Sequence, residues 1–263
     1  MDRKIVFFDI DGTIYSFTKG IPEDTAKAIR QLKANGHIPV ICTGRTKVLI
    51  YKEFLDIGFE HIVAGAGTYV ESEGRELFYR ELGTAELKRI IAGFKKNGFS
   101  SLVEGRDYIY MNENEFDLTP ATEKFTAIYR NTLKDKCKSV YEDEICASKV
   151  SGGWTKTSDP ETMIREFSDK YKVVNHNGVL LELVPKECTK ATGIETLINE
   201  LRIPRENTYA FGDSFNDLEM LEYVEYGIAM GNSDPEIFKH VKYWTADFDK
   251  GGIREGLKMM GLI

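Results

Sequence analysis

The feature that most constrains the fold is a repeated alternation of short apolar runs and amphipathic helical stretches. Residues 5–8 form an apolar run of strand-forming residues, and a helical pattern covers 22–36. A second apolar run covers 38–42, a second helical pattern 48–58, and a third apolar run 62–64. This alternation is typical of β-α-β units, in which successive strands are parallel and helices cover the sheet. The pattern predicts a doubly wound, Rossmann-like α/β sheet.

The alternation stops after about residue 83, where hairpin signals and helices mix. Asn177-Gly178 between two apolar runs is a strong hairpin signal. The stretch therefore predicts an inserted α+β cap domain with an antiparallel sheet. Thr84 can cap an expected helix that Asn97-Gly98 ends, a second expected helix covers 121–133, and another starts at 158–161. The expected strands cover 100–104, 108–111, 145–150, 171–176 and 179–184.

From Lys190 the first alternation returns, so one α/β domain is split by the insert. We expect core residues 1–82, a cap of 83–186 and core residues 187–263. The expected returning helices cover 191–201, 216–223 and 252–260, with another starting at 234; the expected strands cover 209–211, 226–229 and 242–244.

Composition excludes several classes of protein. The net charge of -7 over 263 residues argues against a nucleic-acid binder, which usually carries a basic excess. No stretch approaches the roughly 18 apolar residues of a membrane helix, so we expect no membrane partner. The four cysteines form no C-x-x-C pair, which favours free thiols in a reducing compartment. These observations predict a cytoplasmic protein.

Polar residues gather where the predicted strands end, and ligand sites of open α/β sheets form at the carboxyl ends of strands. Asp9 and Asp11 stand two apart, so their carboxylates can share one face and repel each other. Asp213 and Asp217 add carboxylates from a later strand end. Hard oxygen ligands from several loops suit Mg²⁺.

Other residues at these positions suit a phosphate. Gly12 permits a sharp turn that can present backbone N–H groups to an anion, and Thr43 and Lys190 offer donors and positive charge. Each motif alone fits an ordinary turn, helix cap or solvated lysine. Together and in this order, they indicate phosphoryl transfer through an aspartyl intermediate.

The chain resembles the haloacid-dehalogenase-like superfamily over nearly its whole length, and within it the Cof-like sugar-phosphate phosphatases with a large C2B-type cap. Four motifs carry the resemblance: Asp9-Ile10-Asp11-Gly12-Thr13, Thr43-Gly44-Arg45, Lys190, and Gly212-Asp213-Ser214-Phe215-Asn216-Asp217. The resemblance implies a Mg²⁺-dependent phosphoric monoester hydrolase acting on a small phosphorylated metabolite.

The resemblance also implies residue roles. Asp9 would be the nucleophile and Asp11 the acid/base. The phosphate-binding residues would be Gly12, Thr43, Gly44, Lys190 and Asn216, and the metal-binding residues Asp9, Asp11, Asp213 and Asp217, with Asp217 either a direct ligand or a support. One departure is Ala66, where relatives often carry Asn.

Two alternatives stay open: a phosphomannomutase-like phosphoryl mutase, and a catalytically silent phosphometabolite-binding protein. A dehalogenase is disfavoured because Asp11 is retained to protonate a leaving group. The sequence identifies neither the substrate, which the cap would select, nor the oligomeric state, for which a monomer or a weak dimer is expected.

Overall fold

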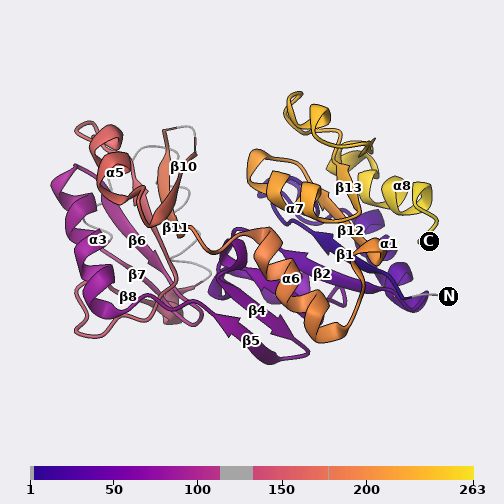
Figure 1. Ribbon diagram of the computed structural model, residues 1–263, viewed down its shortest axis with the longest axis horizontal. Helices are drawn as coiled ribbons and strands as arrows, with labels where there is room; N and C mark the ends of the chain where they lie inside the picture. Colours follow the sequence, from indigo (N-terminus) through magenta and orange to yellow (C-terminus); the bar gives the residue numbers. More distant parts are fainter. Residues whose placement is uncertain (1–2, 113–132, 177) are drawn as a thin grey trace. The chain divides into compact units, whose positions relative to one another are not determined.

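The computed structural model describes residues 3–112, 133–176 and 178–263 (Figure 1). The chain divides into two compact units. The core unit consists of residues 1–45, 50–78 and 189–263, and the inserted unit of residues 46–49 and 79–188. Among the described residues, no helix combines the length and the apolar character needed to cross a membrane.

The core unit is built on an eight-stranded sheet in which β1 lies between β12 and β2. The strands from β14 to β3 are parallel, and β4 runs antiparallel to β3. In sheet order the strands are β14 (Tyr243–Trp244), β13 (Tyr226–Ala229), β12 (Thr208–Gly212), β1 (Ile5–Phe8), β2 (Ile38–Cys42), β3 (His61–Ala64), β4 (Tyr69–Ser72) and β5 (Arg75–Tyr79).

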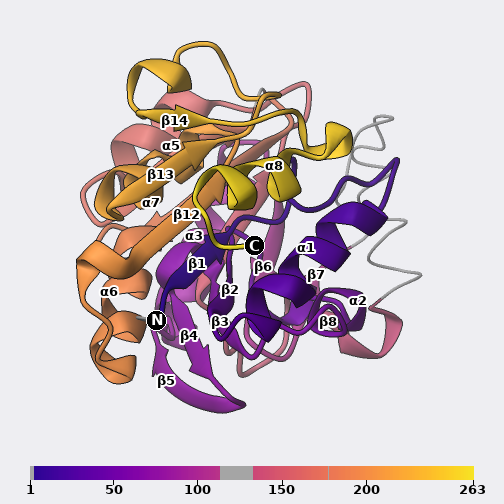
Figure 2. The same cartoon turned by 90° about the vertical axis from the view of Figure 1, so that its right-hand side faces the viewer.

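Helices cover both faces of this sheet, as the doubly wound pattern predicts (Figure 2). Ile5 and Phe7 of β1 belong to the same apolar cluster as Ile194 of α6 and Met220 of α7. On the other face α1 and α8 lie against each other. These helices are α1 (Glu23–Ala34), α6 (Lys190–Leu201), α7 (Leu218–Tyr223) and α8 (Gly252–Met259).

Most core elements lie where the sequence predicts them, with three differences. The helix expected over 48–58 is only a 3-10 turn at Lys47–Leu49 and the short α2 (Lys52–Leu55). The helix expected from residue 234 is a single 3-10 turn, Ile237–Lys239. The strands β4 and β5 were not predicted, because each mixes its apolar residues with polar or charged ones: β4 reads YVES and the half-exposed β5 reads RELFY.

The inserted unit contains a six-stranded sheet of mostly antiparallel pairs. Helices α3 (Thr84–Lys96) and α5 (Pro160–Phe167) pack on one face of it (Figure 1), where Phe94 and Phe167 join an apolar cluster with Val103 and Leu183. In sheet order the strands are β10 (Tyr171–His176), β11 (Leu180–Pro185), β9 (Lys149–Gly153), β6 (Ser100–Glu104), β7 (Ile109–Met111) and β8 (Cys137–Ser139).

The expected hairpin of β10 and β11 is confirmed by their antiparallel pairing. The strand expected over 145–150 is wrong in its bounds, since β9 begins at Lys149 and extends through two glycines to Gly153. Apolar runs favour Ile145 as a strand start, but the pairing of β9 with β6 and β11 decides its extent. The helix expected over 121–133 falls almost wholly outside the described residues, and Asn177 of the hairpin turn is also outside them.

Candidate active site

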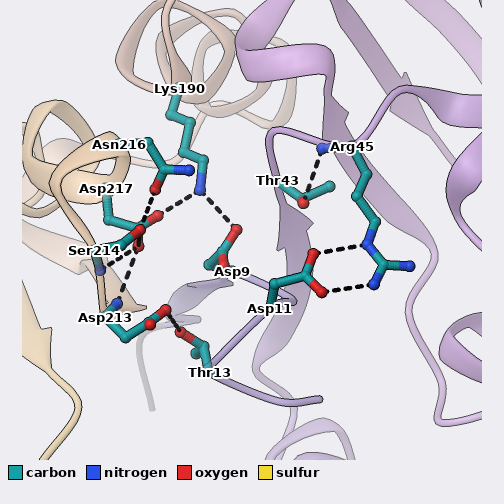
Figure 3. A network of polar contacts seen from close by, with 10 residues as sticks. All are labelled: Asp9, Asp11, Thr13, Thr43, Arg45, Lys190, Asp213, Ser214, Asn216 and Asp217. Carbon is teal, nitrogen blue, oxygen red and sulfur yellow. Dashed lines mark hydrogen bonds and ion pairs between the residues drawn. The ribbon is translucent and has the colours of Figure 1, made fainter. Parts of the chain in front are cut away.

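Three neighbouring strands deliver the central side chains of the site. Asp9 follows β1, Thr43 follows β2 and Asp213 follows β12, and β1 pairs with both other strands. The Asp9 N–H donates to the Phe211 carbonyl at 3.0 Å, which continues the strand pairing through Asp9. The parallel arrangement therefore places the three residues at one edge of the sheet, and Figure 3 shows the polar contacts that each of them makes.

Lys190 joins two of the acidic residues. It is the first residue of α6, and its side chain is fully buried. Its Nζ donates to Asp9 Oδ1 at 2.7 Å and also to Asp217 Oδ1 (Figure 3). Burial alone would lower the pKa of Lys190, but Asp217 and Asp9 raise it above its ordinary value. Lys190 is therefore a fixed cation beside Asp9.

Asp217 uses both carboxylate oxygens within the protein. Its Oδ1 accepts from Lys190, and its Oδ2 accepts from the N–H groups of Asp213 and Ser214, each at 3.0 Å. The Ser214 hydroxyl oxygen also lies 3.3 Å from Oδ2. The residue is fully buried. Asp217 thus holds both Lys190 and the loop that carries Asp213.

Asp213 lies against the turn at Gly12. The Thr13 hydroxyl donates to Asp213 Oδ1 at 3.1 Å. Gly12 has φ +83°, and a Cβ built on it would lie 2.2 Å from Asp213 Oδ2. Only glycine fits this close approach. The Gly12 N–H donates to the Tyr15 carbonyl at 2.8 Å, and its own carbonyl accepts from the Asn232 side-chain amide at 2.9 Å.

Carboxylates outnumber cations around Asp9. Asp9, Asp213 and Asp217 each offer an oxygen, and these oxygens lie within 4.8 Å of one another. Burial, followed by the charge of Asp217, raises the pKa of Asp213 to about 7. Burial also raises the pKa of Asp9 well above its ordinary value, although Lys190 opposes this. A bound divalent cation would relieve this excess charge, so the donor set fits Mg²⁺.

The Thr43 and Asn216 side chains are held by local contacts. The Arg45 N–H donates to the Thr43 hydroxyl at 3.2 Å, and Thr43 is buried. The Ser214 hydroxyl donates to Asn216 Oδ1 at 2.5 Å (Figure 3), and the amide nitrogen of Asn216 lies near Gly44. A Cβ built on Gly44 would lie 3.8 Å from that nitrogen. The loops after β2 and β12 therefore meet at these residues.

The Asp11 carboxylate has a different partner. Arg45 donates to it twice, from Nε to Oδ2 at 2.7 Å and from Nη2 to Oδ1 at 2.6 Å (Figure 3). The sequence leaves the role of Arg45 open, because contact with the substrate or the cap and an ordinary salt bridge are about equally consistent with an arginine after Thr-Gly. Ser214 gained no role from the sequence, although it stands in the fourth motif, and neither did Asn232.

Ala66, the departure from the usual Asn, has φ 54° and ψ 40°. This is the left-handed region, which Gly and Asn occupy more readily than other residues. Its N–H donates to the Thr43 carbonyl at 3.0 Å, so the loop after β3 is hydrogen-bonded to the backbone of Thr43. The backbone conformation explains why Asn suits this position, and Ala66 adopts it without a side-chain hydrogen bond of its own.

Known proteins resemble this chain over its whole length. Residues 6–257 match the family described as haloacid dehalogenase-like hydrolase. A Bacillus subtilis protein named "Putative phosphatase YkrA" is 29% identical over 264 residues, covering 100% of each chain. The 5-amino-6-(5-phospho-D-ribitylamino)uracil phosphatase YitU of Bacillus subtilis is 27% identical, covering 97% of this chain and 96% of its own.

Two solved structures extend the likeness to the whole fold. A protein from Geobacillus kaustophilus HTA426 superposes with a TM-score of 0.84 and 30% identity, covering 100% of both chains. The subclass IIB sugar phosphatase BT4131 superposes with a TM-score of 0.79 and 25% identity, covering 99% of this chain and 100% of its own. The likeness therefore extends over both the core unit and the inserted unit.

Proposed function

The chain belongs to the haloacid dehalogenase-like hydrolase family, and we propose that it is a Mg²⁺-dependent phosphatase of a small phosphorylated metabolite. The observation that carries the proposal is the buried Asp9 carboxylate, bonded through one oxygen to Lys190 and lying within 4.8 Å of the oxygens of Asp213 and Asp217. A carboxylate fixed through one oxygen can attack with the other. Such a nucleophile divides phosphate ester hydrolysis into two easier steps.

In the first step, the second oxygen of Asp9 forms a bond to phosphorus as the ester P–O bond breaks. The departing oxygen takes a proton from the carboxyl group of Asp11. In the second step, the Asp11 carboxylate takes a proton from water, and the water oxygen displaces Asp9 and releases inorganic phosphate. Asp9 and Asp11 lie two residues apart on one loop, which suits action on opposite sides of a single phosphorus.

The metal would be held by the Asp9 and Asp213 carboxylates and the Asp11 backbone carbonyl. When bound, it offsets repulsion between Asp9 and the phosphate, roughly 4 kcal/mol per charge pair at about 4 Å and an effective dielectric of 20. Both oxygens of Asp217 are used by Lys190 and backbone N–H groups. We therefore assign Asp217 to support of Lys190 and Asp213 rather than to direct ligation.

Phosphoryl oxygens would be bound by Lys190, the Thr43 hydroxyl, the Gly44 N–H and the Asn216 amide. The Thr43 oxygen accepts from Arg45, and its own hydrogen can donate to an anion. The Gly12 N–H is already bonded to the Tyr15 carbonyl, so we assign to Gly12 the close turn beside Asp213 rather than a phosphate contact.

The substrate class follows from two relatives. One is named a phosphatase of a phospho-D-ribityl compound, and another a sugar phosphatase. Both names describe phosphate esters of hydroxylated carbon chains. We therefore propose a sugar phosphate or a related phosphomonoester for this chain, hydrolysed in the cytoplasm.

The test is a phosphate-release screen with Mg²⁺ over sugar phosphates, nucleotides, flavin mononucleotide and pyridoxal phosphate. We expect steady release of phosphate from at least one ester, inhibition by EDTA, and a loss of roughly 10⁴-fold or more in Asp9→Asn with an unchanged circular dichroism spectrum. Transfer of the phosphoryl group to a sugar without net release would support the mutase. Absence of turnover for the whole panel would support a binding protein, and substantial activity in Asp9→Asn would disprove the nucleophile.

A further inference from the structure

Arg45 and Asp11 form a two-point contact. The Nε and Nη2 atoms of Arg45 donate to separate oxygens of the Asp11 carboxylate, at 2.7 and 2.6 Å. This is the fork arrangement in which the planar guanidinium fixes the orientation of a carboxylate as well as its position. Both oxygens of Asp11 are therefore oriented by a single side chain.

The two partners differ in exposure. The Arg45 side chain is 9% exposed, whereas the Asp11 side chain is 44% exposed. A half-exposed aspartate on a loop ordinarily samples several rotamers, because little packs against it. The buried partner is therefore the one that limits the rotamers of Asp11.

Aromatic rings enclose the Arg45 guanidinium. Its Cζ lies 5.2 to 5.4 Å from the centroids of four rings, within the range of cation–π attraction. Two rings come from the segment directly after Asp11, and two from α2 and the residue before it. The rings are those of Tyr15, Phe17, Tyr51 and Phe54.

The backbone of Arg45 is also held on both sides. Its N–H donates to the Thr43 hydroxyl at 3.2 Å, and its carbonyl accepts from the Gly65 N–H at 2.7 Å. The side chain therefore extends from a fixed backbone into an enclosed position. Such preorganisation exceeds what an ordinary surface ion pair requires, since exposed pairs contribute little and are loosely held.

We propose that Arg45 is a positioning residue that orients the Asp11 carboxyl group toward the leaving-group oxygen. The inference rests on the proposed function, in which Asp11 gives and takes the proton. When Asp11 carries that proton, one of the two Arg45 contacts opens and the other maintains the orientation. After transfer, the proton is on the departing alcohol, Asp11 is a carboxylate, and the observed two-point contact forms again.

The test compares two leaving groups in order to separate the contribution of proton transfer to the rate from other contributions. p-Nitrophenolate departs without a proton, whereas a sugar alkoxide needs one. For Arg45→Met we expect kcat/KM, which reports the step in which the ester bond breaks, to fall about 30- to 100-fold on the sugar phosphate that the wild type hydrolyses fastest. On p-nitrophenyl phosphate we expect kcat/KM to fall by less than about 3-fold, because the second step, in which Asp11 activates water for both esters, does not enter kcat/KM.

Three further variants make the result specific. Arg45→Lys retains the charge but not the fork, so its loss should also be selective for the sugar phosphate. Arg45→Met added to Asp11→Asn should cost less than about 2-fold beyond Asp11→Asn alone, because the residue that it positions is already disabled. Arg75, which pairs with Glu200 on the surface of the core unit, supplies the matched control Arg75→Met, with no expected effect.

Thermal melting of each variant reports whether it folds. Equal losses of kcat/KM on both esters, additive losses in the double variant, or a large rise in KM for both esters would overturn the inference, the last by placing Arg45 on the phosphoryl group. Should Arg45→Met fail to fold, Arg45→Lys and its double variant with Asp11→Asn decide the question by the same criteria. A wild type that hydrolyses no ester disproves the proposed function itself, which is a distinct result.

Discussion

Each unit of this protein buries a lysine between two carboxylates. In the core unit Lys190 contacts Asp9 at 2.7 Å and also Asp217. In the inserted unit Lys149 lies 2.9 Å from Glu182 and 3.4 Å from Glu104. The two clusters share their residue chemistry and their burial, so a difference in role must come from what surrounds them.

The surroundings differ in charge balance. Asp213 adds a further carboxylate beside Lys190, and burial with the charge of Asp217 raises its pKa to about 7. In the inserted unit burial would raise the pKa of Glu182, but Lys149 and His176 lower it to about 2. Glu104 also accepts a hydrogen bond from the Ser151 hydroxyl at 2.9 Å. In the core cluster three carboxylates share one lysine, whereas in the inserted cluster two carboxylates share Lys149 and also interact with Ser151 and His176, so the inserted cluster is the better compensated.

The largest expected difference is in catalysis. Lys190→Met removes the fixed cation beside Asp9, so we expect kcat on p-nitrophenyl phosphate to fall by roughly 10³-fold. Lys149→Met should change it by less than about 3-fold, because the compensated cluster is not part of the proposed reaction. Initial rates of phosphate release with Mg²⁺ measure both. A comparable loss in Lys149→Met would contradict the comparison and make the inserted cluster part of the reaction.

The second difference is in stability. Lys149→Met leaves Glu104 and Glu182 buried without a cation, which should lower the unfolding free energy by about 3–5 kcal/mol. Replacing all three charges in Glu104→Gln/Lys149→Met/Glu182→Gln should recover most of that loss. Urea unfolding followed by Trp154, which lies in the inserted unit, measures this in a Trp244→Phe background. If the triple variant were no more stable than Lys149→Met, the unpaired carboxylates would not be the cause of the loss, and the three side chains would stabilise the unit in another way.

The sequence predicts the two clusters unequally well. Asp9, Thr43 and Asp213 each follow an apolar run, and the carboxyl ends of neighbouring parallel strands must meet, so their convergence was predictable. Lys149 meets Glu104 across the β9–β6 pair, while Glu182 lies opposite Ser151. Such contacts depend on register, and the predicted strand over 145–150 overlaps β9 only at residues 149–150.

The same reasoning explains what was missed within the active site. The contacts of Arg45 depend on the rings of Tyr15, which lies in the loop after β1, and Tyr51, which precedes the short α2. The engagement of both Asp217 oxygens depends on loop amides that no pattern of residue types reveals. Element positions follow from hydrophobic periodicity, whereas the orientation of side chains at loops follows from tertiary packing.

The third difference is in the response to metal. Mg²⁺ at about 100 times its Kd should stabilise the protein by about 2.7 kcal/mol, because it binds the folded acidic cluster. Asp213→Asn should remove this stabilisation, whereas Glu182→Gln should leave it unchanged. Thermal melting with Mg²⁺ or EDTA measures the shift in Tm. If Asp213→Asn kept the full shift, the metal would bind elsewhere.

The smallest difference is in pH dependence, and the two clusters should respond with opposite signs. Because the pKa of Asp213 is raised, this group stabilises the folded metal-free protein at pH values below 3.8, the ordinary pKa of an aspartate. This contribution to the unfolding free energy is lost as the pH rises through about 7. In EDTA, Asp213→Asn should therefore gain about 1–2 kcal/mol relative to the wild type between pH 5 and 8. His37 and His61, whose pKa burial lowers, titrate in both proteins and cancel in this difference.

Glu182 behaves in the opposite way, because its pKa of about 2 lies below its ordinary value of 4.5. Its contribution is present above that value and is lost as pH falls toward 2. The stability advantage of the wild type over Glu182→Gln should thus be constant above pH 5 and shrink in acid. Urea midpoints from Trp154 and Trp244 follow the two units separately, since each tryptophan lies in a different unit. The wild type should lose stability relative to Asp213→Asn as pH rises, and gain it relative to Glu182→Gln. If both stability differences changed in the same direction with pH, charge balance would not distinguish the clusters around the two buried lysines.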